Sequence, residues 1–324
     1  MLTQVTPSPS TIALEQTYAT CGTFLRAQRV TSASGFDAAI LGIPFDLATS
    51  NRPGARLGPA AIRAASAQLA DLKAYPGGFD PLQHVRLADL GDVHFEYGKP
   101  GNIAAVIEEA ASSVIDSGAF LCALGGDHFV SYPLIKAHAK RHGPLALVHF
   151  DAHTDTWTSS SRGEEAVELN HGTMFWRAID DGLIVPERSV QIGIRTWVDD
   201  PLGVNILDNE FVEETSAQRI AGIVRSVTAG QPCYVSVDID CLDPAFAPGT
   251  GTPVSGGLTP LKLLQILRAL DGLNIVGFDL VEVSPPYDVA GLTALNAATI
   301  VYEQICRLAR QRGAITKRYP AVLI

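Results

Sequence analysis

The sequence predicts an α/β protein built around a mostly parallel β-sheet. From about residue 36 onward, short apolar runs alternate with amphipathic segments and turn residues, as in repeated βα units. Several of these runs are continuously apolar, which is typical of strands that are covered on both faces. No Pro/Ser-rich linker divides the 324 residues. We therefore expect an N-terminal arm over residues 1–30 and a single domain over residues 31–324.

The expected strands are the apolar runs, taken in chain order. They cover residues 38–43, 85–89, 119–124, 145–150, 189–194, 233–237 and 275–281. Between them, segments with apolar residues at helical spacing predict helices over residues 58–69, 103–115, 133–141, 217–228, 259–270 and 293–310. Thr259 followed by Pro260 is a good start for one of them, because threonine caps a helix and proline suits its first position.

Composition narrows the class of partner. The chain has 24 Lys+Arg against 34 Asp+Glu, a formal net charge of −10, and it has no basic run. This balance argues against nucleic acid or an anionic membrane as partner and favours a small cationic molecule.

The cysteines indicate the compartment. The five cysteines are scattered and form no CxxC pair, as expected of buried thiols in a reducing environment. No apolar stretch reaches the roughly 18 to 20 residues of a membrane span. The first positive side chain is Arg26, so the N-terminus does not resemble a secretory signal. We expect a cytoplasmic protein.

Acids and histidines follow three of the expected strands, where α/β proteins place their ligands. The run 119–124 leads into Asp127 and His128, the run 145–150 into the segment 151–155, and the run 233–237 into the segment 238–243. In an extended chain, residues two apart point the same way. Asp151, His153 and Asp155 would then share one face, as would Asp238 and Asp240. We expect these side chains to converge where three neighbouring strands end.

That convergence predicts a metal centre. Buried carboxylates cannot remain ionised together unless cations compensate them. Two divalent ions balance four carboxylates, and oxygen and nitrogen ligands without thiolate suit Mn²⁺. The candidate ligands are His128, Asp151, His153, Asp155, Asp238 and Asp240. His149 lies deeper in its strand, so we expect a core or supporting role for it.

Two further residues are candidates for chemistry. Glu282 follows the apolar run 275–281, so its carboxylate is also expected at the carboxyl end of a strand. His171 opens an expected helix after a polar loop, and a histidine is the natural proton shuttle near pH 7. Taken alone, Glu282 also fits a surface acid and His171 a capping histidine.

The motifs GGDH, DAHTD and SVDIDCLDP resemble the signatures of the ureohydrolase family, which includes arginases and agmatinases. The resemblance covers residues 36–310 and includes GIPFDLATSNRPGARLGPAAIR and VEVSPPYD. GGDHF, LVHFDAHTDT, NHGTMF and SVQIGIRT are most similar to agmatinases. It implies an arginase-like three-layer α/β/α sandwich with a mainly parallel central sheet and a homo-trimer or homo-hexamer.

The resemblance also implies roles. His128, Asp151, Asp155 and Asp238 would hold one Mn²⁺, and Asp151, His153, Asp238 and Asp240 would hold the other. Glu282 would bind the substrate's guanidinium, His171 would shuttle protons, and Asp155 would pass a proton to the leaving amine. Asp127 would orient ligands or stabilise its turn. The implied reaction is hydrolysis of agmatine to putrescine and urea.

The substrate's tail leaves alternatives open. Glu164, Glu165 and Glu168 in the loop 157–171 favour the ammonium of agmatine. Arg52, Arg56 and Arg162 would instead suit the carboxylate of a guanidino acid such as guanidinobutyrate, and arginine is a weaker alternative. Asn170 departs from agmatinases, which often have an acid before the active-site histidine. A catalytically silent metal-binding subunit is the non-enzyme alternative.

Overall fold

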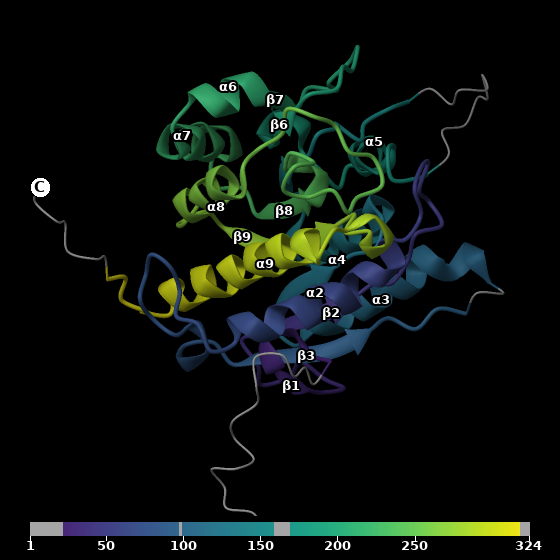
Figure 1. The fold of residues 1–324 in the computed structure, drawn as a ribbon. Coiled ribbons are helices and arrows are strands. Elements are labelled where there is room, and N and C mark those ends of the chain that lie inside the picture. Colours follow the sequence, from purple (N-terminus) through teal and green to yellow (C-terminus); the bar gives the residue numbers. More distant parts are fainter. Residues whose placement is uncertain (1–21, 97–98, 159–168, 318–324) are drawn as a thin grey trace, which may run out of the picture.

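The computed structural model describes residues 22–96, 99–158 and 169–317, which form one nine-stranded, all-parallel sheet in the order β1-β3-β2-β4-β9-β8-β5-β6-β7 (Figure 1). The strands are β1 (Gln28–Arg29), β2 (Ala38–Gly42), β3 (Leu87–Asp92), β4 (Phe120–Leu124), β5 (Ala146–Phe150), β6 (Val190–Ile194), β7 (Asn205–Asp208), β8 (Cys233–Asp238) and β9 (Ile275–Val281).

Helices cover both faces of the sheet. One face carries α2 (Gly58–Ser66), α6 (Asn209–Glu214), α7 (Ala217–Thr228), α8 (Pro260–Ala269) and α9 (Leu292–Gln311). The other carries α3 (Ile103–Asp116), α4 (Ser131–His142) and α5 (Met174–Asp180). This arrangement confirms the three-layer α/β/α fold (Figure 1).

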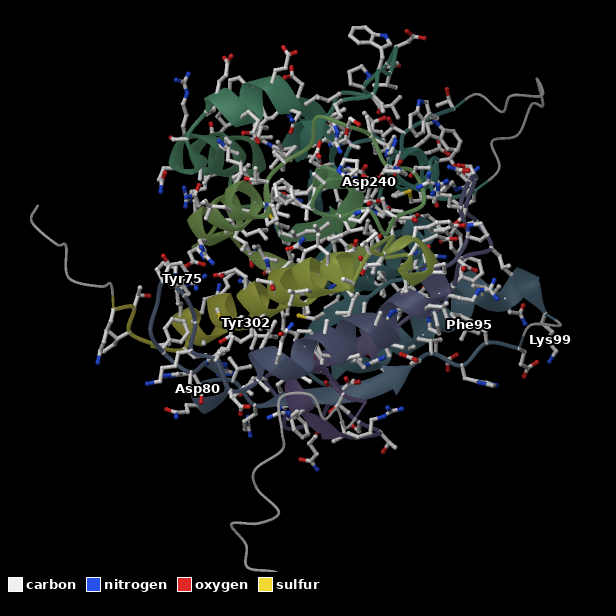
Figure 2. All side chains as sticks on the ribbon, in the orientation of Figure 1. Tyr75, Asp80, Phe95, Lys99, Asp240 and Tyr302 are labelled. Atoms are coloured by element: carbon white, nitrogen blue, oxygen red, sulfur yellow. The ribbon has the colours of Figure 1, made fainter. Side chains whose placement is uncertain are left out.

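The alternation of side chains along each strand supplies two separate cores. In β4, Cys122 and Leu124 pack in the core beneath α9, whereas Leu121 and Ala123 pack in the core beneath α3 and α4. Both faces of β4 are therefore removed from water, which is why this strand is continuously apolar in the sequence. Side chains fill the layer between α9 and its neighbours, where the hydroxyl of Tyr302 donates to the carbonyl of Leu72 at 2.6 Å (Figure 2).

Most expected elements are present, with ends shifted by one or two residues. The boundaries of α7 and β9 match the predictions. The strand predicted over residues 85–89 is wrong at its start. The amide of Val85 closes a turn on the carbonyl of Pro81, and the strand begins at Leu87. The helix expected over residues 58–69 ends as a 3₁₀ turn (Ala67–Leu69). The sequence missed α6 and the two edge strands β1 and β7, which are short and carry polar, exposed residues.

The order of the strands corrects one expectation. The three strands that precede the Asp/His motifs are β4, β5 and β8, and they are not all neighbours, because β9 lies between β4 and β8. The residue that follows β9 is Glu282. The fold thus inserts the candidate guanidinium-binding carboxylate among the candidate metal ligands.

The packed chain begins before residue 31. Phe24 and Leu25 are buried in the core, and β1 pairs with β3. Most of the expected arm, residues 1–21, lies outside the described residues, as does Cys21. The described cysteines Cys122, Cys233, Cys241 and Cys306 are buried free thiols. Within the described ranges, no helix has the length and apolar character needed to cross a membrane.

Candidate metal centre

The candidate ligands meet at the carboxyl ends of β4, β8 and β5. His128 opens the 3₁₀ turn after β4, Asp151 follows β5, and Asp238 is the last residue of β8. Asp151 and His128 are fully buried, and Asp155, Asp238 and Asp240 are nearly so. Asp240 lies in the interior at this edge of the sheet (Figure 2).

The Nδ1 atom of His128 is placed to bind a cation. This nitrogen is buried and makes no hydrogen bond within the described residues. Carboxylate oxygens nevertheless surround it: Oδ2 of Asp155 lies at 2.9 Å, Oδ2 of Asp151 at 3.2 Å and Oδ2 of Asp238 at 3.3 Å. One imidazole nitrogen and three carboxylate oxygens in contact form a donor set that fits a divalent ion such as Mn²⁺.

A second group lies next to the first and shares Asp151 with it. Asp151, His153 and Asp240 each present a ligand atom, and these atoms lie within 4.8 Å of one another. Nδ1 of His153 is 3.2 Å from Oδ1 of Asp151 and 3.2 Å from Oδ2 of Asp240. The structure thus brings all six candidate ligands together as two adjoining groups.

Asp155 and Asp240 reach the cluster through turns and not through the extended backbone expected from the sequence. Asp240 lies in a 3₁₀ turn (Ile239–Cys241), and its own backbone amide donates to Oδ1 of Asp238 at 2.8 Å. Asp155 has a φ of 52°, in the left-handed region that non-glycine residues rarely adopt. Two tight turns therefore aim these carboxylates inward, and simple alternation does not.

The electrostatics of the cluster favour bound cations. Burial, followed by the charge of Asp151, raises the pKa of Asp240 to about 6. Burial and the charge of Asp240 likewise hold the pKa of Asp238 well above its ordinary value. Burial alone would lower the pKa of His128, but its three carboxylate neighbours outweigh burial and raise it. In the metal-free protein, protons bound to these groups supply the positive charge that metal ions would otherwise provide.

A buried carboxylate supports His128 from behind. Asp279 of β9 is fully buried and accepts hydrogen bonds from the hydroxyls of Ser131, Tyr234 and Ser236 at 2.6–2.7 Å. Because the Ser236 hydroxyl donates to Asp279, its lone pair is left to accept from Nε2 of His128 at 2.8 Å. This direction places the proton of a neutral His128 on Nε2 and leaves the lone pair of Nδ1 free to bind a metal ion among the carboxylates.

Glu282 and His171 form a buried pair beside the cluster. Oε1 of Glu282 accepts from the backbone amide of His128 at 2.8 Å and lies 3.0 Å from Nδ1 of His171. Burial would lower the pKa of His171, but the hydrogen bond and charge of Glu282 raise it to about 9. Nε2 of His171 meets the hydroxyl of Ser50 at 2.7 Å and its amide at 3.0 Å. The amide requires a lone pair on Nε2, so this contact favours the neutral imidazole and opposes the effect of Glu282.

The second carboxylate oxygen of Glu282 is available to bind a ligand. Oε2 is buried and has no hydrogen-bond partner in the described part of the chain. A Cβ added at Gly251 would lie 3.3 Å from it, so the absence of a side chain there leaves space beside this oxygen. Glu282 itself has a φ of 64°, a strained conformation that the surrounding packing maintains.

The remaining candidates serve the loops around the site. Oδ2 of Asp127 accepts from the amide of Ala48 at 2.8 Å, so Asp127 fastens the loop that carries Ser50. The side chain of Asn170 accepts from the amide of Gly172 at 2.9 Å and thus holds the turn that leads into α5.

The arginines proposed for the substrate's tail are already engaged. Arg56 is paired with Asp46, and the guanidinium of Arg52 lies 5.3 Å from the ring centroid of Tyr287. Arg162, Glu164, Glu165 and Glu168 lie outside the described residues.

Sequence reasoning missed the supporting residues Ser50, Ser236 and Asp279, and also Gln191 of β6, whose buried side chain donates to the carbonyl of Thr154 at 2.6 Å. Three of them lie in strands at positions where an apolar residue would be expected, so a polar residue inside a buried strand is the signal that could have identified them. Ser50 gave no such signal, because its loop approaches His171 only through tertiary packing.

Comparison with known proteins agrees with this architecture. Residues 36–306 match the arginase family. The chain is 48% identical to an agmatinase of Chromobacterium violaceum over 305 residues, which covers 94% of each chain. The structure superposes on a hypothetical agmatinase from Burkholderia thailandensis with a TM-score of 0.88, 48% identity and coverage of 92% and 94% of the two chains. It superposes on proclavaminate amidino hydrolase from Streptomyces clavuligerus with a TM-score of 0.85, 38% identity and coverage of 91% and 99%. The chain therefore belongs to the arginase family.

Proposed function

We propose that this protein is a binuclear-manganese ureohydrolase that cleaves agmatine to putrescine and urea. The observation that carries the proposal is the unpartnered, buried Oε2 of Glu282 beside the cluster of candidate ligands. A carboxylate oxygen in that state is suited to a guanidinium, which is planar and donates in pairs. The similarity to proteins named agmatinases supports the choice of substrate.

Each residue then has a physical task. Glu282 holds the guanidinium so that its central carbon lies over the cluster, and the space at Gly251 admits the group. Asp155, whose Oδ2 faces Nδ1 of His128, is placed to take and return a proton. His171 bridges Glu282 and Ser50, and in this proposal it passes protons between the site and solvent.

His128, Asp151, Asp155 and Asp238 would hold one Mn²⁺, and Asp151, His153, Asp238 and Asp240 the other. When bound, two such ions acidify water enough for it to attack a carbon near neutral pH, and they stabilise the negative charge that develops. The fit of His128 Nδ1 and the raised pKa values of Asp238 and Asp240 support this assignment.

We further propose that the substrate's tail carries an ammonium and that the protein is cytoplasmic and oligomeric. Arg56 is held by Asp46, which makes it a poor receptor for the carboxylate of a guanidino acid and favours agmatine over guanidinobutyrate. The buried free cysteines fit a reducing, cytoplasmic location. A homo-trimer or homo-hexamer, the assembly implied by the family resemblance, is checked by light scattering on the purified protein.

Replacing the key carboxylate tests the proposal. Glu282→Gln should keep bound Mn²⁺, because Glu282 is not a candidate ligand, but should lower kcat/KM for agmatine by about 100-fold or more, because a charged pair with the guanidinium is lost. Metal content and urea release are measured together. Glu108→Gln on α3, which removes a carboxylate paired with Lys136 and Lys140 far from the site, is the control. Near wild-type turnover in Glu282→Gln would reject Glu282 as the guanidinium site.

A further inference from the structure

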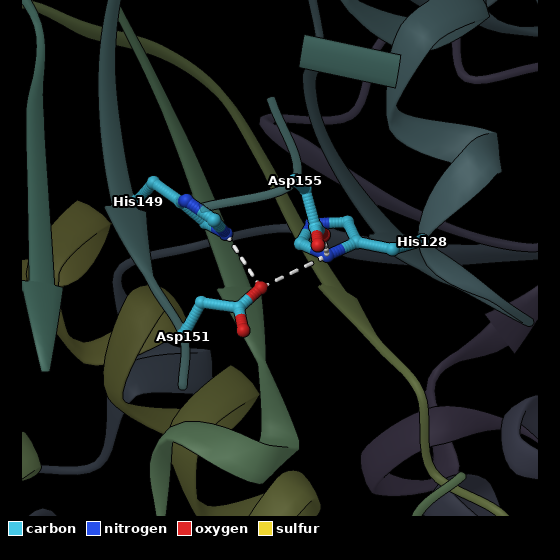
Figure 3. A group of neighbouring side chains, drawn as sticks. All are labelled: His128, His149, Asp151 and Asp155. Atoms are coloured by element: carbon cyan, nitrogen blue, oxygen red, sulfur yellow. Dashed lines mark hydrogen bonds and ion pairs between the residues drawn. The ribbon is translucent and has the colours of Figure 1, made fainter. Parts of the chain in front are cut away.

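His149 is a third histidine at the candidate metal centre, and its role is open to two interpretations. Its ring lies in the same group of side chains as His128, Asp151 and Asp155 (Figure 3). Nε2 of His149 is 2.8 Å from Oδ2 of Asp151. His149 could bind a metal through this nitrogen, or it could donate a proton from it to Asp151. The two interpretations require opposite tautomers, because a nitrogen that carries a proton cannot coordinate a metal.

The other nitrogen of the ring decides between them. Nδ1 of His149 is 3.2 Å from the side-chain nitrogen of Gln191 in β6, the neighbouring strand. An amide NH₂ can only donate, so Nδ1 must accept and carries no proton. A neutral imidazole has a single ring proton, which is then on Nε2 and points at Asp151.

A second contact fixes which end of the Gln191 amide faces His149. The same nitrogen donates to the backbone carbonyl of Thr154 at 2.6 Å. If the amide were reversed, its oxygen would lie against that carbonyl oxygen, and two acceptors would repel each other at this distance. The Thr154 carbonyl therefore fixes the orientation of the Gln191 amide, and the amide fixes the tautomer of the His149 imidazole.

The packing around His149 leaves this arrangement no freedom. His149 is fully buried and Gln191 nearly so. The ring of Phe175 lies edge-on to His149 with centroids 4.6 Å apart, and the ring of His128 lies at 5.1 Å. A rotation of the imidazole would meet these rings and would break both hydrogen bonds.

We propose that His149 is a positioning residue and not a metal ligand, and that Gln191 fixes the tautomer in which it donates to Asp151. The proposal rests on the metal centre of the proposed function. It adds a chain of hydrogen bonds, called the relay below, that links the Thr154 carbonyl, the Gln191 amide, the His149 imidazole and the Asp151 carboxylate. Asp151 is shared by both groups of candidate ligands, and its other oxygen accepts from the amide of His153 at 2.6 Å. With one donor on each oxygen, the plane of this carboxylate is fixed for both ions.

Spectroscopy tests the tautomer and the ligand count without any turnover. Nitrogen-15 NMR of the full-length, metal-free chain, with His149 assigned from the His149→Gln variant, should show the ring proton of His149 on Nε2. Electron spin-echo spectroscopy of the Mn²⁺-loaded protein should show the same imidazole nitrogen couplings in the wild type and in His149→Gln. A proton on Nδ1, or the loss of a nitrogen coupling in His149→Gln, would overturn the proposal.

Metal titration tests the relay. His149→Phe, which removes the donor, and Gln191→Leu, which frees the tautomer, should each weaken Mn²⁺ binding about 10- to 100-fold. His149→Gln should recover much of the affinity, because its amide can donate to Asp151. Gln304→Leu, which removes another buried glutamine on α9 away from the site, is the control for general destabilisation. Wild-type affinity in Gln191→Leu would overturn the relay. Absence of Mn²⁺ binding by the wild-type protein would instead reject the proposed function, and the NMR result on the metal-free chain would still decide the tautomer.

Discussion

At the scale of single residues, side chains that are not themselves candidate ligands hold the metal ligands in place, as Ser236 does behind His128. Asp151, His153 and Asp238 could be predicted from the sequence because each lies at the end of a buried strand or within three residues of it. The left-handed turn at Asp155 and the 3₁₀ turn at Asp240 could not, since they depend on contacts between distant segments. The same holds for the hydrogen bond from His128 to Ser236, two residues that are 108 positions apart.

Ser236→Ala tests this support at the metal centre. The variant removes the acceptor from Nε2 of His128, so we expect the affinity for one of the two Mn²⁺ ions to fall about 10- to 100-fold, while the other ion binds normally. A titration that resolves two sites measures this. Tyr234→Phe removes another hydroxyl from the same carboxylate, Asp279, without touching His128, and should bind both ions as the wild type does. Equal weakening of both sites in Ser236→Ala would contradict the account.

At the scale of elements, strand periodicity predicted the central sheet but not its order. Mainly apolar runs marked β2, β4, β5, β6, β8 and β9, because burial on both faces leaves no regular polar alternation. Single polar residues, namely His149, Gln191, Ser236 and Asp279, interrupt four of these runs. The short edge strands were missed because their residues are exposed. The position of β9 between β4 and β8 could not be predicted, because strands distant in the sequence pair there and no local pattern encodes which strands pair.

The turn after β8 offers a test at this scale. The guanidinium of Arg195 donates to the carbonyls of Asp240 at 2.6 Å and Val254 at 2.8 Å, so it ties the Asp240 turn to the following loop. Arg195→Ala should lower the free energy of unfolding by about 3 kcal/mol, because it removes hydrogen bonds from a charged donor, and it should reduce Mn²⁺ occupancy. Chemical denaturation and metal analysis check both. Arg188→Ala, which removes an exposed arginine near Val227, should change neither.

At the scale of the whole molecule, the fold concentrates negative charge at one edge of the sheet, in a chain whose formal net charge is already −10. Composition predicted a cationic ligand and could not say where it binds. The structure supplies the place, because parallel strands end together and bring their following residues to one edge.

This concentration of charge makes metal binding depend on pH. Burial would lower the pKa of His153, but the charges of Asp240 and Asp151 raise it to about 12, so the metal-free imidazole is protonated at neutral pH. Mn²⁺ must displace that proton, and its affinity should therefore rise with pH. Calorimetry in two buffers of different ionisation enthalpy should show release of about one proton or more per protein molecule. Binding without proton release between pH 6 and 8 would contradict the protonated His153.

The most direct test of the central claim is urea release by the Mn²⁺-loaded protein, with agmatine, 4-guanidinobutyrate and L-arginine compared by kcat/KM. The account predicts a preference for agmatine of about 100-fold or more, equivalent to about 2.7 kcal/mol of transition-state binding. A preference for 4-guanidinobutyrate would contradict the substrate assignment, and no urea from any of the three would contradict the assignment of an active ureohydrolase.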